Sequence, residues 1–137
     1  MTELFAPAKS KKISVDIFRV TILCLTSIKQ MREFEKHNRE IIDAPNACTL
    51  QMDEILGVWD RSRGASIRMN VDDETFYIMM LKDKNHVTAA HEAVHMSGQI
   101  LDVKGVPISM DNDEVRAYLT GYIFESLCDV AGLTIKR

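Results

Sequence analysis

Two histidines and a glutamate in the second half of the chain have the spacing of a metal site. Positions 91–95 read His-Glu-Ala-Val-His, an H-E-x-x-H pattern, inside a segment whose apolar spacing predicts a helix. Residues four apart share one face of a helix, roughly 6 Å apart at their β-carbons, so His91 and His95 are expected to bind one zinc ion. Glu92 is rotated by about 100° from His91, which leaves its carboxylate available as a general base. We therefore predict Zn²⁺ as the cofactor and Glu92 as a catalytic residue.

The same pattern also has a purely structural interpretation. The three residues could be polar positions on an amphipathic helix whose core face is formed by Ala89, Ala90, Ala93 and Val94. A chain of this length with 4 histidines contains H-E-x-x-H by chance with a probability on the order of one per cent. Small residues around the histidines also suit a tightly packed site helix, so we favour metal binding.

A zinc site of this type needs a third protein ligand, and Glu114 is the favoured candidate. It follows His95 after 18 intervening residues, at the start of the last predicted helix. Two histidines and a carboxylate leave one coordination position open for water. Alternatively, Glu114 is the inner acid of a capping box that begins at Asp111. The rival ligands are Asp111, Asp113, Glu125 and His86. Of these, Glu125 lies on nearly the same helix face as Glu114.

Tyrosines at intervals of four follow Glu114 on the same predicted helix. Tyr118 and Tyr122 therefore share its stripe, and either phenol could face the metal and stabilise the oxyanion of a tetrahedral intermediate. The competing interpretation is half-buried packing. We name Tyr118 as the second candidate catalytic residue. His37, far from the motif in sequence, is expected at the surface.

The elements that would position these residues follow from periodicity and breakers. The expected elements, in chain order, are a strand at 15–25, a helix at 27–42 with Ser27 as N-cap, a second strand at 48–52, two strands of a hairpin at 65–71 and 75–81, a helix at 87–103, and a last helix from 111 to 131 ended by Gly132. Residues 54–64 show no readable pattern. We expect an α+β fold in which a small mixed sheet carries a hairpin packed on the H-E-x-x-H helix, followed by a C-terminal helix.

Composition limits the remaining possibilities. With 137 residues and 46% hydrophobic content, we expect one domain at 13–137 after a flexible arm at 1–12. The 17 basic and 20 acidic residues give no basic surface for nucleic acid. No segment has the length or flanks of a membrane span or signal peptide. The cysteines lack any CxxC spacing and are interpreted as core thiols of a cytoplasmic protein; they are Cys24, Cys48 and Cys128.

Residues 89–95 (AAHEAVH), the connector with Gly105, and residues 111–125 (DNDEVRAYLTGYIFE) resemble the core of gluzincin-type zincin metallopeptidases. The phrase NDEVRAYLTGYI is also similar to small zincin-like proteins encoded by bacteriophages, which would place the protein in the host cytoplasm. The resemblance implies zinc on His91, His95 and Glu114, with Glu92 as general base. It also implies an edge strand along the site helix, 65–71 or 75–81, to which an extended protein or peptide substrate adds.

Two departures from that family leave a rival interpretation open. The chain is expected to lack the second domain that forms the far wall of a peptidase cleft. It also lacks an H-x-x-G-x-x-H continuation, since Gly98 is present but position 101 is Leu. The leading hypothesis is a zinc metallopeptidase, and the alternative is a non-catalytic zincin-fold protein that binds another protein or belongs to a virion. An intact Glu92 favours chemistry, because a purely structural metal site does not need it.

Overall fold

A computed structural model describes residues 11–135 of the chain. The elements in chain order are β1 (Lys11–Val15), the 3₁₀ turn η1 (Asp16–Phe18), β2 (Val20–Leu25), α1 (Ile28–Ile42), α2 (Met52–Arg61), β3 (Gly64–Val71), β4 (Glu74–Leu81), α3 (His86–Val103), the 3₁₀ turn η2 (Met110–Asn112) and α4 (Asp113–Ala131). This is an α+β fold. Most of the predicted arm, residues 1–10, lies outside the described residues, whereas Lys11 and Lys12 are paired in β1.

The strands form one mixed sheet with the order β1-β2-β4-β3. β1 is antiparallel to β2, β2 is parallel to β4, and β3 is antiparallel to β4. The predicted hairpin is confirmed, and its two-residue turn places Asp72 and Asp73 at φ values of 49° and 67°. Asp tolerates this left-handed conformation better than most residues. β3 is last in the strand order and is therefore an edge strand of the sheet.

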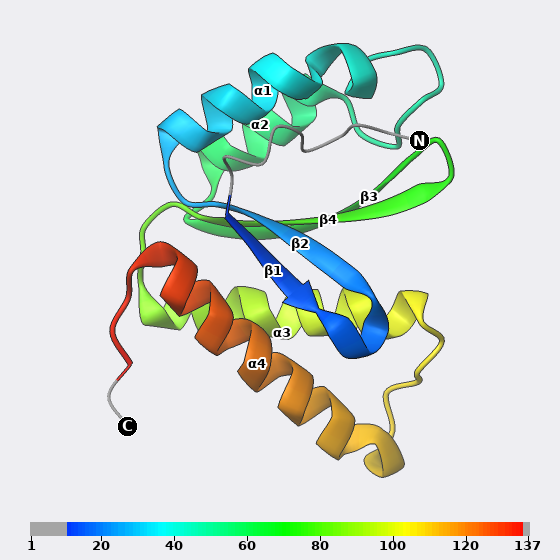
Figure 1. The fold of residues 1–137 in the computed structure, drawn as a ribbon, viewed down its shortest axis with the longest axis vertical. Coiled ribbons are helices and arrows are strands. Elements are labelled where there is room, and N and C mark those ends of the chain that lie inside the picture. Colours follow the sequence, from blue (N-terminus) through cyan, green and yellow to red (C-terminus); the bar gives the residue numbers. More distant parts are fainter. Residues whose placement is uncertain (1–10, 136–137) are drawn as a thin grey trace.

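Helices cover both faces of the sheet, with α1 and α2 on one side and α3 and α4 on the other (Figure 1). The central strands are buried on both faces, which explains their nearly continuous apolar sequence. Alternate residues enter the two cores: Ile22 and Met79 pack with α3 and α4, whereas Leu23 and Ile78 pack with α1 and α2. None of the helices in residues 11–135 is long and apolar enough to cross a membrane.

Two predicted elements differ from the structure. The strand expected at 15–25 is interrupted by η1 and by Arg19, whose φ of 54° turns the chain back so that β1 and β2 pair. The strand expected at 48–52 was wrong, because the chain enters helix α2 at Met52. A capping box between Gln51 and Glu54 starts this helix, and Glu54 Oε1 accepts the Gln51 N–H at 3.0 Å.

The two helices of the predicted site form where the sequence placed them. α3 begins after Asn85, whose side chain accepts the Val87 N–H at 2.8 Å. α4 ends at Gly132, which adopts a φ of 74° as a left-handed C-cap. A hydrogen bond of 2.7 Å between the hydroxyls of Ser97 and Thr120 joins α3 to α4. These contacts fix the helix that carries His91 and His95 against its neighbour.

Candidate functional site

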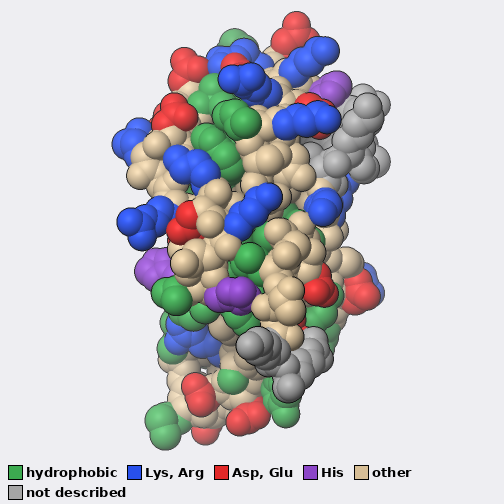
Figure 2. Space-filling model, turned by 90° about the vertical axis from the view of Figure 1, so that its left-hand side faces the viewer, with side chains coloured by type: hydrophobic (Ala, Val, Ile, Leu, Met, Phe, Trp, Pro, Cys, Tyr) green, Lys and Arg blue, Asp and Glu red, His purple; other side chains and the backbone are tan. Residues whose placement is uncertain are grey.

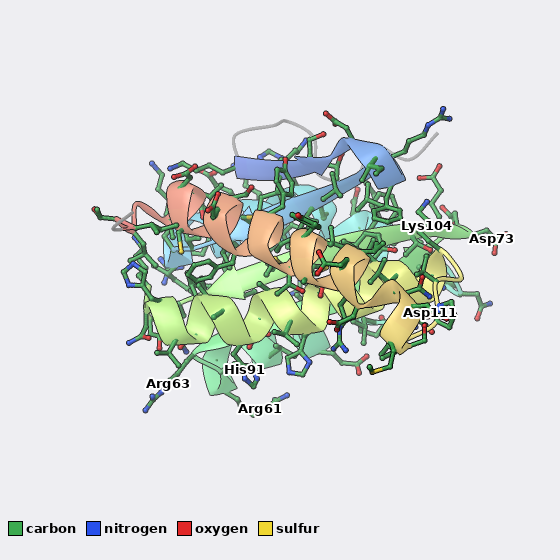
Figure 3. The ribbon with its side chains drawn as sticks, turned by 90° about the horizontal axis from the view of Figure 1, so that it is seen from below. Arg61, Arg63, Asp73, His91, Lys104 and Asp111 are labelled. Carbon is green, nitrogen blue, oxygen red and sulfur yellow. The ribbon has the colours of Figure 1, made fainter. Side chains whose placement is uncertain are left out.

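His91 and His95 lie together on the exposed face of α3. Their Nε2 atoms are 3.1 Å apart, so one ring donates a hydrogen bond to the other, and the ring centroids are 4.7 Å apart. The opposite face of α3 is buried, because Ala89, Ala93 and Met96 pack into the core below the sheet. Figure 3 shows His91 projecting from α3 on the side of the molecule where Arg61 and Arg63 also project. The amphipathic pattern therefore holds both imidazoles outward and side by side.

This arrangement suits two ligands of a single metal ion. Two nitrogens bound tetrahedrally to zinc at roughly 2.0–2.1 Å are about 3.3 Å apart. The observed separation of 3.1 Å between the Nε2 atoms of His91 and His95 is close to that value. The rings therefore need little reorientation to share one metal ion through Nε2.

Glu92 points to the other side of α3, toward the edge strand β3. It is buried, with 7% of its surface exposed. The Ser66 hydroxyl lies 2.8 Å from the Glu92 carbonyl oxygen and 3.0 Å from its Oε1, and donates to them. Gly64 allows this close approach, because a β-carbon there would lie 3.2 Å from Glu92 Cγ and 2.7 Å from Thr88 Cγ2. The carboxylate is thus held between α3 and β3.

Among the described residues, no candidate third ligand is grouped with His91 and His95. Within residues 11–135, no group of three or more His, Cys, Asp or Glu side chains is arranged to hold a metal ion. Glu114 is exposed in the first turn of α4. The alternative capping box is not formed, because the N-cap is Asn112 and it makes no side-chain capping hydrogen bond. Glu114 as a ligand stays a prediction.

The rival ligands are also dispersed. Figure 3 shows Asp111 at the opposite end of α3 from His91. Asp113 and Glu125 are exposed on α4. His86 is engaged elsewhere, since its Nε2 lies 2.7 Å from the Thr134 carbonyl oxygen.

The predicted tyrosines line a different cavity. Tyr118 and Tyr122 face η1 and the end of β1, in an apolar pocket of about 520 Å³ that includes neither histidine. Tyr122 Oη donates to the Ser14 carbonyl oxygen at 2.5 Å. The structure therefore does not bring Tyr118 to the pair formed by His91 and His95. His37 is exposed on α1, as predicted.

A groove of about 790 Å³ runs beside His95, between β3 and α3. We call it the β3–α3 groove; it is lined by Leu50, Ser66, Ile67, Arg68, Val94, His95, Gly98, Gln99, Asp102, Ile108 and Arg116. Arg68 and Asp102 form an ion pair of 3.0 Å across it. On α4, Arg116 reaches the groove, whereas Glu114, two residues earlier, is about 200° away around the helix.

Sequence reasoning missed the polar residues of β3 and Arg116 on α4. The alternation of side chains along β3 could have indicated these polar residues. Ile67, Met69 and Val71 are buried in the core between the sheet and the helices α1 and α2, so Ser66 and Arg68 face the opposite side of the sheet. That alternation predicts which residues of β3 share a face of the sheet, but it does not predict which helix packs on that face. Contact of Ser66 with Glu92, 26 residues away, depends on how the sheet packs on α3.

The cysteines do not contribute to this site. Cys24 and Cys128 are buried and Cys48 is partly buried, and all three are free thiols. Burial raises the pKa of Cys24 to about 12. Burial, followed by the charges of Asp129 and Glu125, also raises the pKa of Cys128. Both buried thiols are therefore held in the protonated form, which is a poor metal ligand and a poor nucleophile.

Comparisons of the chain with protein-family models, curated proteins and solved structures gave no match. Function is therefore inferred from the chemistry of the residues around α3 and β3.

Proposed function

We propose that the protein is a zinc-dependent hydrolase of the zincin type, most specifically a peptidase. The observation that carries this proposal is the His91–His95 pair, with Nε2 atoms 3.1 Å apart and His95 in the lining of a groove, on the helix that also carries Glu92. His91 and His95 would hold the metal, and Glu114 is the proposed third ligand. When bound, zinc would lower the pKa of a water molecule and polarise a substrate carbonyl.

Glu92 is the proposed general base. Its carboxylate would take a proton from the attacking water as the water oxygen bonds to the carbonyl carbon, and would deliver that proton to the leaving nitrogen as the C–N bond breaks. Ser66 donates to Oε1 at 3.0 Å and so orients the carboxylate. No hydrogen-bond partner is found for Oε2 within residues 11–135, which makes it the atom available to carry the proton.

The edge strand supports a peptide as the substrate. In antiparallel pairing, a residue's N–H and C=O face the same side, and that side alternates along the strand. Asn70 faces away from β4, because its N–H donates to Thr49 Oγ1 at 3.2 Å and its carbonyl accepts the Thr49 N–H at 3.1 Å. Arg68 and Ser66 therefore face the same open edge, where Gln99 Nε2 donates to the Ser66 carbonyl at 3.1 Å. An extended peptide in the β3–α3 groove would pair with this edge.

One observation favours the alternative of a non-catalytic protein-binding role on the same scaffold. Across residues 11–135 the two histidines lack a clustered third ligand. A weakly held or missing metal would leave the edge strand and groove as a recognition surface. The two proposed functions differ in zinc binding, because the hydrolase requires a bound zinc ion and the protein-binding role does not.

Zinc stoichiometry tests the proposal directly. The chain, purified without a metal-affinity tag, is measured by elemental analysis beside its His95→Ala, Glu114→Ala and Glu92→Gln variants. We expect zinc at a one-to-one ratio in the wild type and in Glu92→Gln, and its loss from the other two variants. His37→Ala, at an exposed histidine on α1, is the matched control and should retain zinc. A wild-type chain that stays metal-free after zinc supplementation would overturn the hydrolase proposal.

A further inference from the structure

The β3–α3 groove carries one cation that no acidic side chain balances. Arg68 and Asp102 neutralise each other at 3.0 Å. Arg116 also lines the groove, and within residues 11–135 it forms no ion pair. Asp113, one turn earlier on α4, is exposed and lines a small cavity together with Arg116, but no ion pair joins the two among the described residues. A partly buried guanidinium without a counter-ion favours an anion supplied by a ligand.

Packing of α4 on α3 fixes the position of Arg116. Thr120 lies one turn later on the same helix face, and its hydroxyl is 2.7 Å from that of Ser97 on α3. Ile123, a further turn along, is fully buried in the core. The guanidinium therefore sits on the face of α4 that meets α3, and shares the groove wall with His95.

Apolar side chains line part of the groove. Leu50, Val94 and Ile108 contribute to its lining, and Ile108 is 73% exposed. The groove thus combines apolar side chains with the guanidinium of Arg116, which is unpaired within residues 11–135, and the Arg68–Asp102 ion pair lies in the same lining. A matching ligand has an apolar side chain close to a carboxylate.

The other side of the histidine pair is cationic as well. Figure 3 shows Arg61 and Arg63 projecting on the same side of the molecule as His91. Neither forms an ion pair in the part of the chain that the structure describes. Figure 2 shows lysine and arginine side chains spread over the neighbouring face, with few acidic groups among them in its middle. This field would attract a negatively charged substrate toward His91 and His95.

We propose that Arg116 is a specificity-determining residue whose guanidinium binds a carboxylate of the substrate. That carboxylate belongs either to an Asp or Glu side chain or to the C-terminus of a peptide. The inference rests on the proposed function, because it assigns the substrate class of that same site.

Binding of matched peptides tests this assignment without requiring turnover. Fluorescently labelled peptides containing Leu are made in pairs, with Asp or Glu against Asn or Gln, and with a free against an amidated C-terminus. Their affinity for the full-length, zinc-supplemented Glu92→Gln chain is measured by fluorescence anisotropy. We expect the acidic member of one pair type to bind about tenfold more tightly, a difference of about 1.4 kcal/mol. The pair type that shows the preference identifies the source of the carboxylate.

Substitutions at Arg116 then locate the preference. Arg116→Gln should abolish the ratio between acid and amide forms, and Arg116→Lys should retain part of it, since lysine keeps the charge but not the fork. Lys104→Gln, the same change of charge at the C-cap of α3, is the matched control and should leave the ratio unchanged. Circular dichroism establishes that each variant is folded. An acid preference that survives in Arg116→Gln, or no preference and no binding in any pair, would overturn the proposal.

The outcome is separable from that of the hydrolase proposal. Wild-type protein is incubated with the same peptides, and cleavage is followed by mass spectrometry. An acid preference that depends on Arg116, without cleavage by the wild type, would support the specificity assignment while contradicting the hydrolase. Cleavage of acid and amide forms at equal rates, with equal binding, would support the hydrolase while contradicting the role of Arg116.

Discussion

At the scale of single residues, burial divides the three thiols into two chemical kinds. The pKa of Cys24 is raised to about 12 by burial, whereas Cys48 is partly buried and accepts the Leu50 N–H through sulfur at 3.4 Å. Alkylation requires the thiolate. Because the folded pKa of Cys24 lies above its ordinary value of 9.0, its thiol stays protonated as the pH rises toward and past 9 and ionises only near 12.

Iodoacetamide labelling should therefore distinguish Cys48 from the buried pair. Between pH 7 and 9, we expect native protein to be labelled first at Cys48, with Cys24 and Cys128 at least about tenfold slower, because they need local unfolding. Peptide mass spectrometry over a time course gives the three rates. Cys48→Ser should remove the fast phase. Labelling in guanidinium should make the labelling rates of the three cysteines equal. Labelling of native Cys24 as fast as Cys48 would contradict the burial of Cys24 in the core.

The residues of the site were predictable to different degrees. His91 and His95 meet because four residues make about one helical turn, so their spacing alone was sufficient. The neighbours of Glu92 were not predictable, because Ser66 reaches it across 26 residues through the packing of β3 on α3. Arg116 was missed for the same reason, since the phase of α4 against α3 is set by contacts such as Ser97 with Thr120.

At the scale of elements, the sequence predicted those with strong periodicity. α1, α3, α4 and the β3–β4 hairpin were found because apolar spacing and caps agree in each. α2 was missed because its signal is short: Met52, Ile55 and Trp59 form a helical stripe over only ten residues, interrupted by Gly57. The interruption before β2 was missed because Arg19 adopts a positive φ, and an arginine in the sequence does not predict this backbone conformation.

The close packing of β3 on α3 depends on Gly64. A β-carbon at this position would lie 2.7 Å from Thr88 Cγ2 and 3.0 Å from the Met80 carbonyl oxygen, and the latter is backbone and cannot turn aside. We expect Gly64→Ala to lower the free energy of unfolding by about 1–3 kcal/mol, the usual cost of overpacking. Urea denaturation measures the change.

A second glycine provides the control for Gly64→Ala. In α4, Gly121 has nothing within 4 Å of a built β-carbon. Gly121→Ala should therefore leave stability unchanged or raise it by up to about 1 kcal/mol, as alanine favours helix. Equal effects of the two substitutions would show that the close approach at Gly64 is not a constraint on the fold.

At the scale of the whole molecule, the two helical layers differ in their relation to the histidine pair. α1 and α2 cover one face of the sheet, whereas α3 carries His91 and His95 and is braced by α4 on the other (Figure 1). The proposed third ligand, Glu114, also belongs to α4. Zinc shared between α3 and α4 would therefore tie together two helices that now meet through apolar packing and the Ser97–Thr120 hydrogen bond.

Zinc should consequently raise the melting temperature of the whole domain. A ligand that binds only the native state stabilises it by about 2.7 kcal/mol at a free concentration of one hundred times Kd. For a domain of this size, that corresponds to an increase in Tm of roughly 10 °C. Differential scanning calorimetry with graded zinc would follow the increase, with magnesium as the ionic control. His95→Ala should lose it because the pair is broken, and Glu114→Ala should lose it only if that carboxylate is the third ligand. An equal increase in all three proteins would place zinc elsewhere on the molecule and contradict a site built on α3.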